Sequence, residues 1–364
     1  MDPSFEYIFP AIRGIQAGRE FYVSMCPLRL LPKIFTFDDE ELIPELRAQR
    51  VLNKARIPEM ARYIISNMND YVFSAITASI DAKVRFEALG QSGEANRVGS
   101  LHIPMDARFI INDGQHRRAA IELALREKPD LADETIAVVF FLDKGLNRCQ
   151  QMFADLNRYA IRPSKSLGIL YDYRDDMALL AKSVVLKSPV FKDVVEMEKS
   201  TLSPRARKLF TLSSIYFATN ELLESIDGSQ EEKTNMAINY WVEVAKYIKE
   251  WNLVRARKMT SAEVRREFIH SHGIALQSIG KVGNHLLRNN PANWKRTLKK
   301  IENIDWSRSN SQLWEGRCMI GGRVSKSSHN VTLTTNAIKA ALSLPLSSSE
   351  TRVEEAYKRG DYEK

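Results

Sequence analysis

Five adjacent residues carry the side chains best suited to chemistry in this chain: Asp113, Gly114, Gln115, His116 and Arg117. They follow an apolar run typical of a strand and open a helix-like segment, where a glycine lets the backbone turn sharply. The start of a helix offers free N–H groups and the positive end of its dipole. Arg117, with Arg118 beside it, suits phosphate oxygens, and His116 can exchange protons near neutral pH. The pentad therefore predicts an anion pocket, and the alternative is a capped strand–helix junction whose arginines face solvent.

Asp113 has three roles open to it at this turn, since its carboxylate can cap the helix, hold Arg117 or bind a metal ion. Further along the chain, Arg158, Arg162 and Lys165 provide three cations within eight residues, and Ser164 and Ser166 add hydroxyls. Such a set suits a triphosphate held by positioning and charge. The alternative is a basic loop paired with the acids of the segment YDYRDD.

The positive charge of the chain is concentrated in one segment. Residues 251–300 hold eleven Lys and Arg and two acids, a net +9, whereas the whole chain carries +8. Trp251, Trp294 and Trp306 lie in or just beyond this segment, which favours a nucleic-acid partner over a solvated helical surface. The cations expected to contact DNA phosphates are Arg255, Arg257, Lys258, Arg265, Arg266, Lys295, Arg296, Lys299 and Lys300.

Two details refine this expectation. Lys295, Arg296, Lys299 and Lys300 have the spacing of one stripe along a helix. A flexible loop, Gly321-Gly322 followed by Arg323 and Lys326, is basic enough to enter a minor groove.

The elements that must position these residues follow from the apolar pattern. Residues 108–112 and 135–142 suit buried strands, and the segment between them reads as a helix that ends before Pro129. Helix signals also cover 37–50 and the segment that begins at Arg56, whereas from Leu146 onward the pattern is almost entirely helical. We therefore expect an α+β protein with an α/β domain over 1–200 and a helical domain over 201–364.

Local signals add detail to the helical half. Thr335 or Asn336 is expected to cap one late helix, and Ser348 or Ser349 the next. The helix–Gly273–helix outline over 262–288 is too apolar for a recognition helix and favours core packing, as do Trp241 and Trp251. His270, His272 and His285 lack the spacing of a metal site.

Composition excludes several classes of protein. No run of 18 apolar residues exists, so no membrane span is expected, and the start of the chain lacks the features of a signal peptide. Cys26, Cys149 and Cys318 stand far apart, which argues against a disulfide framework or a zinc ribbon and favours a reducing cytoplasm. Cys26 and Cys149 are expected to be small buried residues.

The segment INDGQHRRAAI resembles the DGQHR-domain proteins, and the wider run resembles the DndB family of regulators associated with DNA phosphorothioate (sulfur) modification. The resemblance extends through PAIRGIQAGREFYV, RAQRVLNKARIPEMARYI, YVFSAITASI and CQQMFADLNRYAIRPSKSLGILYDYRDD, over roughly residues 7–176. It implies a protein that binds double-stranded DNA at the promoter of the modification genes and represses them. Binding or slow hydrolysis of a nucleotide, most simply ATP, would modulate that contact.

A more distant resemblance is to the ParB and sulfiredoxin fold, in which a G-x-x-R turn between strand and helix binds nucleotide phosphates. It implies a mixed-sheet domain in which residues 114–117 bind the nucleotide phosphates. Sulfiredoxin has a reactive Cys where this chain has Gln115, so sulfinate reduction is not expected. The second ParB nucleotide box resembles residues 154–158 and assigns Asn157 and Arg158 to the nucleotide. The metal-binding acid of that box would have to be Asp155 or be missing from this chain, and this puts Mg²⁺ chemistry in doubt.

Three functions remain open. The first is a DNA-binding regulator that holds a nucleotide at residues 113–118 and 157–166. The second is an NTPase or nuclease with Asp113, His116 and Asp155 as catalytic groups. The third is a scaffold that recruits other sulfur-modification proteins, and a homodimer is compatible with each.

Overall fold

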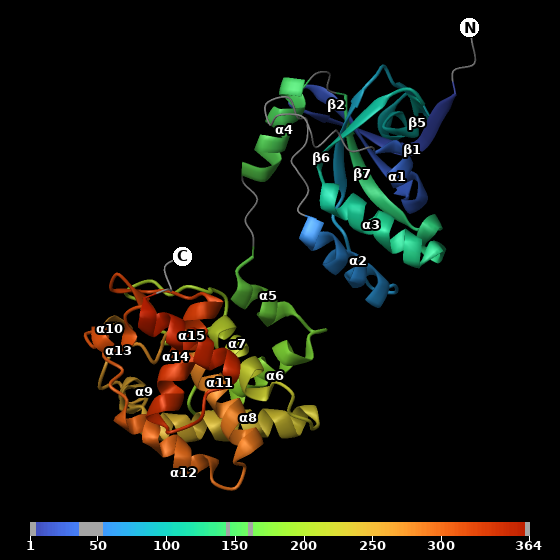
Figure 1. The fold of residues 1–364 in the computed structure, drawn as a ribbon. Helices are drawn as coiled ribbons and strands as arrows, with labels where there is room; N and C mark the ends of the chain where they lie inside the picture. Colours follow the sequence, from blue (N-terminus) through green and yellow to red (C-terminus); the bar gives the residue numbers. More distant parts are fainter. Residues whose placement is uncertain (1–4, 36–53, 143–145, 159–162, 361–364) are drawn as a thin grey trace. The chain divides into compact units, whose positions relative to one another are not determined.

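The computed structural model describes residues 5–35, 54–142, 146–158 and 163–360. The predicted helix over 37–50 and the predicted ligand Arg162 lie outside these residues, as do the side chains of Asn157 and Cys149. The chain forms two compact units, Met1–Ile161 and Arg162–Lys364 (Figure 1). Each unit is described by itself.

The first unit is built on a mixed sheet of seven strands. Strands β3 and β7 run parallel, and every other neighbouring pair is antiparallel. In spatial order the strands are β4 (Arg85–Ala88), β5 (Val98–Pro104), β1 (Glu6–Gln16), β2 (Arg19–Pro27), β7 (Thr135–Phe141), β3 (Ile76–Asp81) and β6 (Arg108–Asp113).

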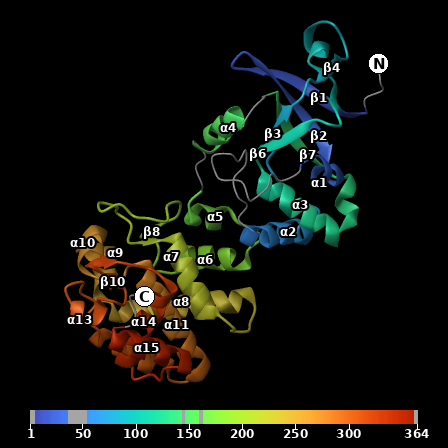
Figure 2. The ribbon, with the colours of Figure 1, turned by 45° about the horizontal axis from the view of Figure 1, so that its top comes forward.

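Helices cover one face of this sheet. In β7 the residues Ile136, Val138 and Phe140 are buried in turn, as the period of two requires. They share a core with Ile121 and Ala124 of the helix α3. In Figures 1 and 2 the helices α2 and α3 lie side by side, and α4 lies apart from them. The helices of this unit are α1 (Leu31–Ile34), α2 (Ile57–Ser66), α3 (Gln115–Glu127) and α4 (Leu146–Arg158), with short 3-10 turns at Leu28–Leu30, Lys54–Arg56, Gly93–Asn96 and Pro129–Asp133.

The second unit is almost entirely helical. Two small two-stranded sheets join β8 (Val195–Glu196) to β9 (Phe210–Thr211), and β10 (Met319–Ile320) to β11 (Arg323–Val324). Its helices are α5 (Lys165–Tyr171), α6 (Asp176–Lys187), α7 (Leu212–Leu223), α8 (Gln230–Tyr247), α9 (Lys249–Arg255), α10 (Ser261–Glu267), α11 (Gly273–Asn289), α12 (Trp294–Leu298), the 3-10 helix η6 (Lys299–Asn303), α13 (Ser311–Trp314), α14 (Ser328–Ala341) and α15 (Ser348–Arg359).

Helix α11 lies at the centre of this unit between α7 and α14. A Cβ at Gly280 would lie 2.1 Å from the carbonyl oxygen of Ala218. Because glycine has no Cβ, α7 can pack closely against α11 at this point. Trp241 and Trp251 are buried and pack edge-to-face on Phe191 and Phe210. The predictions of core packing for α11 and for these tryptophans are therefore confirmed.

Both predicted caps of the last two helices are wrong. Helix α14 begins seven residues before Thr335, and Ser327 accepts the capping hydrogen bond from the amide of Asn330. Thr335 and Asn336 lie inside α14 because buried apolar residues on both sides extend the helix. Helix α15 is capped by Ser347, one residue before the predicted pair, in a reciprocal box with Glu350.

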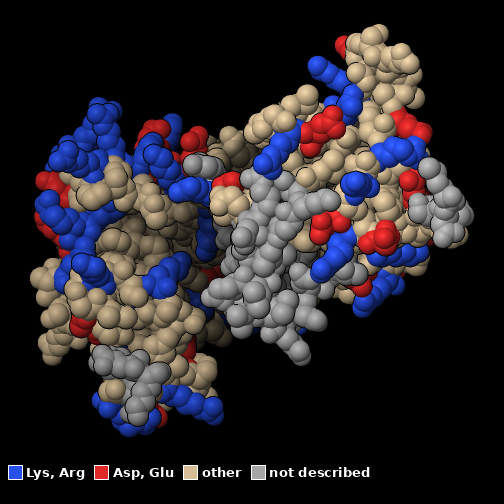
Figure 3. Space-filling view, turned by 90° about the horizontal axis from the view of Figure 1, so that it is seen from above, with Lys and Arg blue, Asp and Glu red and all other residues tan. Residues whose placement is uncertain are grey.

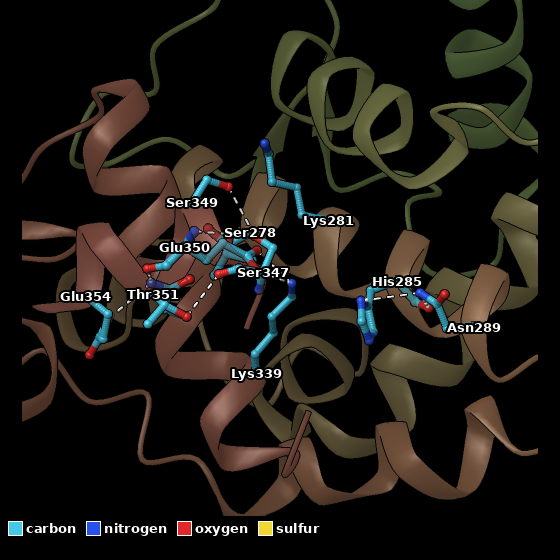
Figure 4. A network of polar contacts seen from close by, with 12 residues as sticks. Ser278, Lys281, His285, Asn289, Lys339, Ser347, Ser349, Glu350, Thr351 and Glu354 are labelled. Carbon is cyan, nitrogen blue, oxygen red and sulfur yellow. Dashed lines mark hydrogen bonds and ion pairs between the residues drawn. The ribbon is translucent and has the colours of Figure 1, made fainter. Parts of the chain in front are cut away.

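Ion pairs hold α15 against α14 (Figure 4). The nearly buried ammonium of Lys339 donates to both carboxylate oxygens of Glu350 at 2.6 and 2.7 Å. Arg317 makes a bidentate pair with Glu354 at 2.9 and 2.6 Å. These bonds attach an amphipathic helix that has no buried residue of its own.

The predicted α+β class is confirmed by the sheet in the first unit and the helices that follow. Helices α5 and α6, which precede residue 200, pack against α7 and α8. The predicted boundary at residue 200 separates domains that would fold independently, and it stays a prediction. Among the described residues, no helix combines the length and apolar character that a membrane crossing requires.

Candidate functional site

The pentad forms a tight turn between β6 and α3. β6 ends at Asp113, and Gly114 adopts φ +107°, a left-handed conformation that favours glycine. A Cβ at Gly114 would lie 3.0 Å from both Arg117 Nη2 and Ile76 Cγ1. The glycine therefore allows both the turn and the close packing of Arg117 over it.

Arg117 is fixed by two acceptors. Its Nη2 donates to Asp113 Oδ2 at 2.6 Å and to the carbonyl oxygen of Ala75 at 3.0 Å. Its buried Nε has no hydrogen-bond partner among the described residues. Of the three roles open to Asp113, the structure shows the second, since α3 has no side-chain cap. The pair preorganises the guanidinium at the start of the helix.

The first turn of α3 is cationic and lacks any acid. The leading N–H groups of a helix have no carbonyl partner within it, and the helix dipole makes them attractive to anions. His116 is half-buried in this turn, and Gln115 is buried with its amide donating to the carbonyl oxygen of Ile111 at 3.3 Å. The geometry therefore suits an anion better than a cation.

Arg118 is engaged elsewhere. Its guanidinium is buried and bonds to Glu122 and to the carbonyl oxygen of Pro32. Burial lowers the pKa of Arg118, and the charge of Glu122 opposes this. Arg118 therefore connects α3 to α1 through the carbonyl oxygen of Pro32.

Helix α4 packs beside the end of β6. The buried amide of Asn112 donates to Ser79 Oγ at 2.7 Å and contacts Met152 Sδ at 3.0 Å. Further along α4, Asp155 is exposed and accepts a bond from Gln151 at 2.8 Å, and Arg158 is exposed at the helix end. The described residues contain no cluster of three His, Cys, Asp or Glu side chains able to hold a metal ion.

Lys165 and Ser166, the remaining predicted nucleotide ligands, belong to the second unit. Ser164 caps α5, and Ser166 is buried with its hydroxyl bonded to Ser213 Oγ and the carbonyl oxygen of Lys199, both at 3.1 Å. The hydroxyl of Ser166 is therefore a structural bridge. That residues 113–118 and 157–166 together form one nucleotide site stays a prediction.

The structure instead brings Lys165 next to Lys326, which the sequence assigned to DNA. Both ammonium groups lie over the ring of Phe217, at 5.5 and 5.1 Å from its centroid. Burial and the charge of Lys165 lower the pKa of Lys326. Neither lysine has an ion-pair partner within the described chain, so an anion here would relieve their repulsion.

The basic segment 251–300 divides between two ends of the helical unit, since α10 and α12 lie far apart in Figure 1. Near α10, Lys258 and Arg257 are exposed, Arg255 is exposed beside Asn252, and Arg266 pairs with Glu267 at 2.8 Å. Arg265 is half-buried and donates to four carbonyl groups of the loop 203–208, so its guanidinium organises that loop.

Further cations gather at this end, and sequence reasoning missed three of them, Arg205, Arg207 and Arg308. Arg265 and Ser261 hold the loop that carries Arg205 and Arg207 against α10. The backbone amide of Arg308 donates to the carbonyl oxygen of Glu267 at 2.8 Å. The guanidinium of Arg308 donates to the carbonyl oxygen of Gly322, the neighbour of Arg323, at 2.9 Å. We call Arg205, Arg207, Arg265, Arg266, Arg308 and Arg323 the α10 cluster. Arg265, Arg266 and Arg323 were predicted to contact DNA, whereas Arg205, Arg207 and Arg308 were not, and the alternating Arg205-Ala206-Arg207 was the local signal that could have indicated the first two of these.

At the other end, the predicted stripe of four cations is interrupted. Helix α12 ends at Leu298, and Lys299 and Lys300 belong to the 3-10 helix η6, which changes their angular spacing. Lys295, Arg296 and Lys299 are exposed, whereas Lys300 donates to Ser343 Oγ at 3.1 Å. Figure 3 shows Lys and Arg spread over the helical unit more densely than Asp and Glu.

Of the three tryptophans that favoured a nucleic-acid partner, two are buried and Trp294 is partly exposed. Trp251 and Trp306 are buried, and Trp306 stacks on Trp314 at 5.2 Å. Cys26 is buried as predicted, and burial raises the pKa of its thiol to about 12. Neither feature provides chemistry at the surface.

Comparison with known proteins agrees with the resemblance seen in the sequence. The family model described as "DndB: DNA-sulfur modification-associated" matches residues 9–345, nearly the whole chain. No curated protein and no solved structure matches the chain at a significant level. The likeness to the ParB and sulfiredoxin fold therefore stays a prediction.

Proposed function

Because this chain belongs to the DndB family of DNA-sulfur modification-associated proteins, we propose that it is a DNA-binding regulator of that modification system. It binds double-stranded DNA at the promoter of the modification genes and represses them. A nucleotide at the turn of residues 113–117 changes its affinity for that DNA. The α10 cluster is the observation that carries the DNA-binding half of the proposal.

Four segments distant in sequence contribute to this cluster, and the exposed members are suited to phosphate. Arg205, Arg207 and Arg323 are exposed and make no ion pair with any described residue. Arginine donates in a planar fork that matches phosphate oxygens, and cations without acidic partners bind the DNA backbone without first breaking a bond. Lys258 and Arg257 extend the same end of the unit.

The turn supports the nucleotide half of the proposal. It presents a helix start without an acid or a side-chain cap, and a guanidinium held in place by Asp113. These groups fit the phosphates of ATP, with Gly114 allowing the backbone to approach them. A Mg²⁺ ion fits less well, because Asp113 is committed to Arg117, and neither Asp113 nor Asp155 belongs to a group of three metal-binding side chains among the described residues. We therefore propose binding rather than metal-assisted hydrolysis at this turn.

A gel-shift titration of promoter DNA with and without ATP, CTP and GTP tests this function. We expect one nucleotide to change the apparent Kd for DNA by about 5- to 150-fold, as typical coupling free energies of about 1–3 kcal/mol imply. Arg117→Ala should abolish this change while leaving DNA binding without nucleotide intact. Arg126→Ala is the matched control, since Arg126 is exposed on the same helix and pairs with Glu122.

Three outcomes would contradict the proposal. No preference for promoter DNA would exclude the regulator, and an equal nucleotide response in wild type and Arg117→Ala would exclude the turn. Nucleotide turnover with Mg²⁺ that is lost in Asp113→Asn would instead support an enzyme.

A further inference from the structure

A pocket of about 670 Å³ opens in the helical unit. Among the cations of the basic segment that were predicted to contact DNA, Lys295 lines this pocket. Helix α8 forms one wall, the end of α11 a second, and the segment that leads into α12 a third. The side chains that matter for the argument are Asn235, Met236, Asn239, Leu287, Arg288, Trp294 and Lys295. Pockets of this volume are typical of small-molecule sites.

The floor of the pocket is apolar and includes a fixed aromatic ring. Met236, Leu287 and Trp294 are each half-buried. The ring of Trp294 packs on Tyr240 at 5.8 Å between centroids, and buried Tyr240 donates to the carbonyl oxygen of Ile279 at 2.7 Å. The core therefore holds the indole in place, which lowers the entropic cost of stacking a planar ligand against it.

Two amides stand above this floor. Asn235 and Asn239 are exposed and lie four residues apart on one face of α8, and their side-chain amides make no hydrogen bond with any described residue. Each amide offers a donor and an acceptor side by side. This combination matches the edge of a nucleobase, and asparagine pairs in this way with adenine in particular.

The charged groups of the pocket favour an anion. Arg288 and Lys295 are exposed and make no ion pair within the described part of the chain. The carboxylate of Glu232 instead accepts bonds from the amide and hydroxyl of Ser229, both at 2.8 Å. Those bonds lower the pKa of Glu232 and keep its charge at the start of α8.

We propose that this pocket binds a nucleoside phosphate, with adenine as the preferred base. The base stacks on Trp294 in place of the ammonium of Lys295, which lies 5.5 Å from the centroid of that ring. Asn235 and Asn239 pair with the edge of the base, and Arg288 and the displaced Lys295 hold the phosphate. The ligand is a free nucleotide or an unpaired nucleotide of DNA, which share this chemistry. The site lies in the second unit and is independent of the turn at residues 113–117, so it goes beyond the regulatory function proposed above.

Calorimetric titration of the full chain with AMP, CMP and a short single-stranded oligodeoxyadenylate tests the proposal. We expect AMP to bind more tightly than CMP. The double variant Asn235→Ala/Asn239→Ala should weaken binding of AMP or the oligonucleotide on the order of tenfold, the loss expected for two hydrogen bonds. Asn220→Ala is the matched control, because Asn220 is exposed on α7 and does not line the pocket.

The variants separate the two sources and the two sites. Weaker AMP binding in the double variant identifies a free nucleotide, and weakening for the oligonucleotide alone identifies DNA. Unchanged affinity for both ligands, or failure of both to bind wild type, would overturn the proposal. Binding that is lost in Arg117→Ala and retained in the double variant would also overturn it, while leaving the turn as the nucleotide site.

Discussion

At the scale of single residues, the surroundings of His272 determine its protonation state. His272 precedes α11, and its Nε2 lies 2.9 Å from the carbonyl oxygen of Arg265, to which it donates. Burial lowers the pKa of His272 to about 4, and the nearby charges of Arg308, His270 and Arg265 act in the same direction. The imidazole is therefore neutral in the folded protein at physiological pH.

We predict that this histidine makes the protein less stable in mild acid. Its pKa in the unfolded chain is about 6.5, so the unfolded state takes up a proton first as the pH falls. The free energy of unfolding that depends on neutral His272 is fully present above pH 6.5 and is lost as the pH falls toward 4. At pH 5 this loss is about 2 kcal/mol. Urea unfolding at pH 7, 6 and 5 checks this.

His272→Gln is the comparison, because its amide can still donate to Arg265 and does not titrate. The variant should lose about 2 kcal/mol less than wild type between pH 7 and pH 5. Equal losses in both proteins would show that His272 does not titrate as described.

At the scale of elements, close approach between helices depends on small residues. Helix α11 contacts α7 where Gly280 faces the carbonyl of Ala218, and Gly283 faces Tyr240 and Leu222 in the same way. Neither contact leaves room for a methyl group. The glycines, which are poor helix formers by themselves, are therefore explained by packing.

We predict that Gly280→Ala lowers the free energy of unfolding by about 1–3 kcal/mol, since overpacking separates the helices. The matched control is Gly168→Ala in α5, where a Cβ would meet nothing within 4 Å. That change should raise stability by up to about 1 kcal/mol through helix propensity alone. Thermal or urea unfolding measures both, and a stabilised Gly280→Ala would contradict the packing described.

At the scale of the whole molecule, charge is arranged by folding rather than by sequence position. The α10 cluster combines Arg205 and Arg207 with Arg266 and Arg323, whereas Lys295, Arg296 and Lys299 lie at the other end of the helical unit. A DNA duplex bound at one end therefore uses only part of the basic segment.

We predict that changing Arg205, Arg207, Arg266 and Arg323 to Gln weakens DNA binding and flattens its dependence on salt. The slope of log K against log salt should fall by nearly one for each DNA phosphate that the variant no longer neutralises. The same change at Lys295, Arg296, Lys299 and Lys300 removes equal charge and should reduce the slope less. A larger reduction from this second set would place the DNA at the α12 end of the helical unit.

The sequence by itself determined the local features of this protein. The strand, the glycine turn and the helix around residues 108–127 follow from apolar periodicity and from the conformational freedom of Gly114, which act over a few residues. The helices that begin near Ile57, Leu146 and Gly273 were predicted on the same grounds. The family was also visible in these short segments.

Only the tertiary structure decided which groups share a surface. Local patterns did not show that Arg118 and Arg265 are engaged by backbone carbonyls, that Trp251 and Trp306 are buried, or that Lys165 meets Lys326 over Phe217. These arrangements depend on contacts between segments far apart in the chain, and spacing within one segment carries no information about them. The predicted caps of α14 and α15 were also misplaced. Buried apolar neighbours extend α14 on both sides of Thr335, and α15 is capped one residue earlier by Ser347, in a reciprocal box with Glu350.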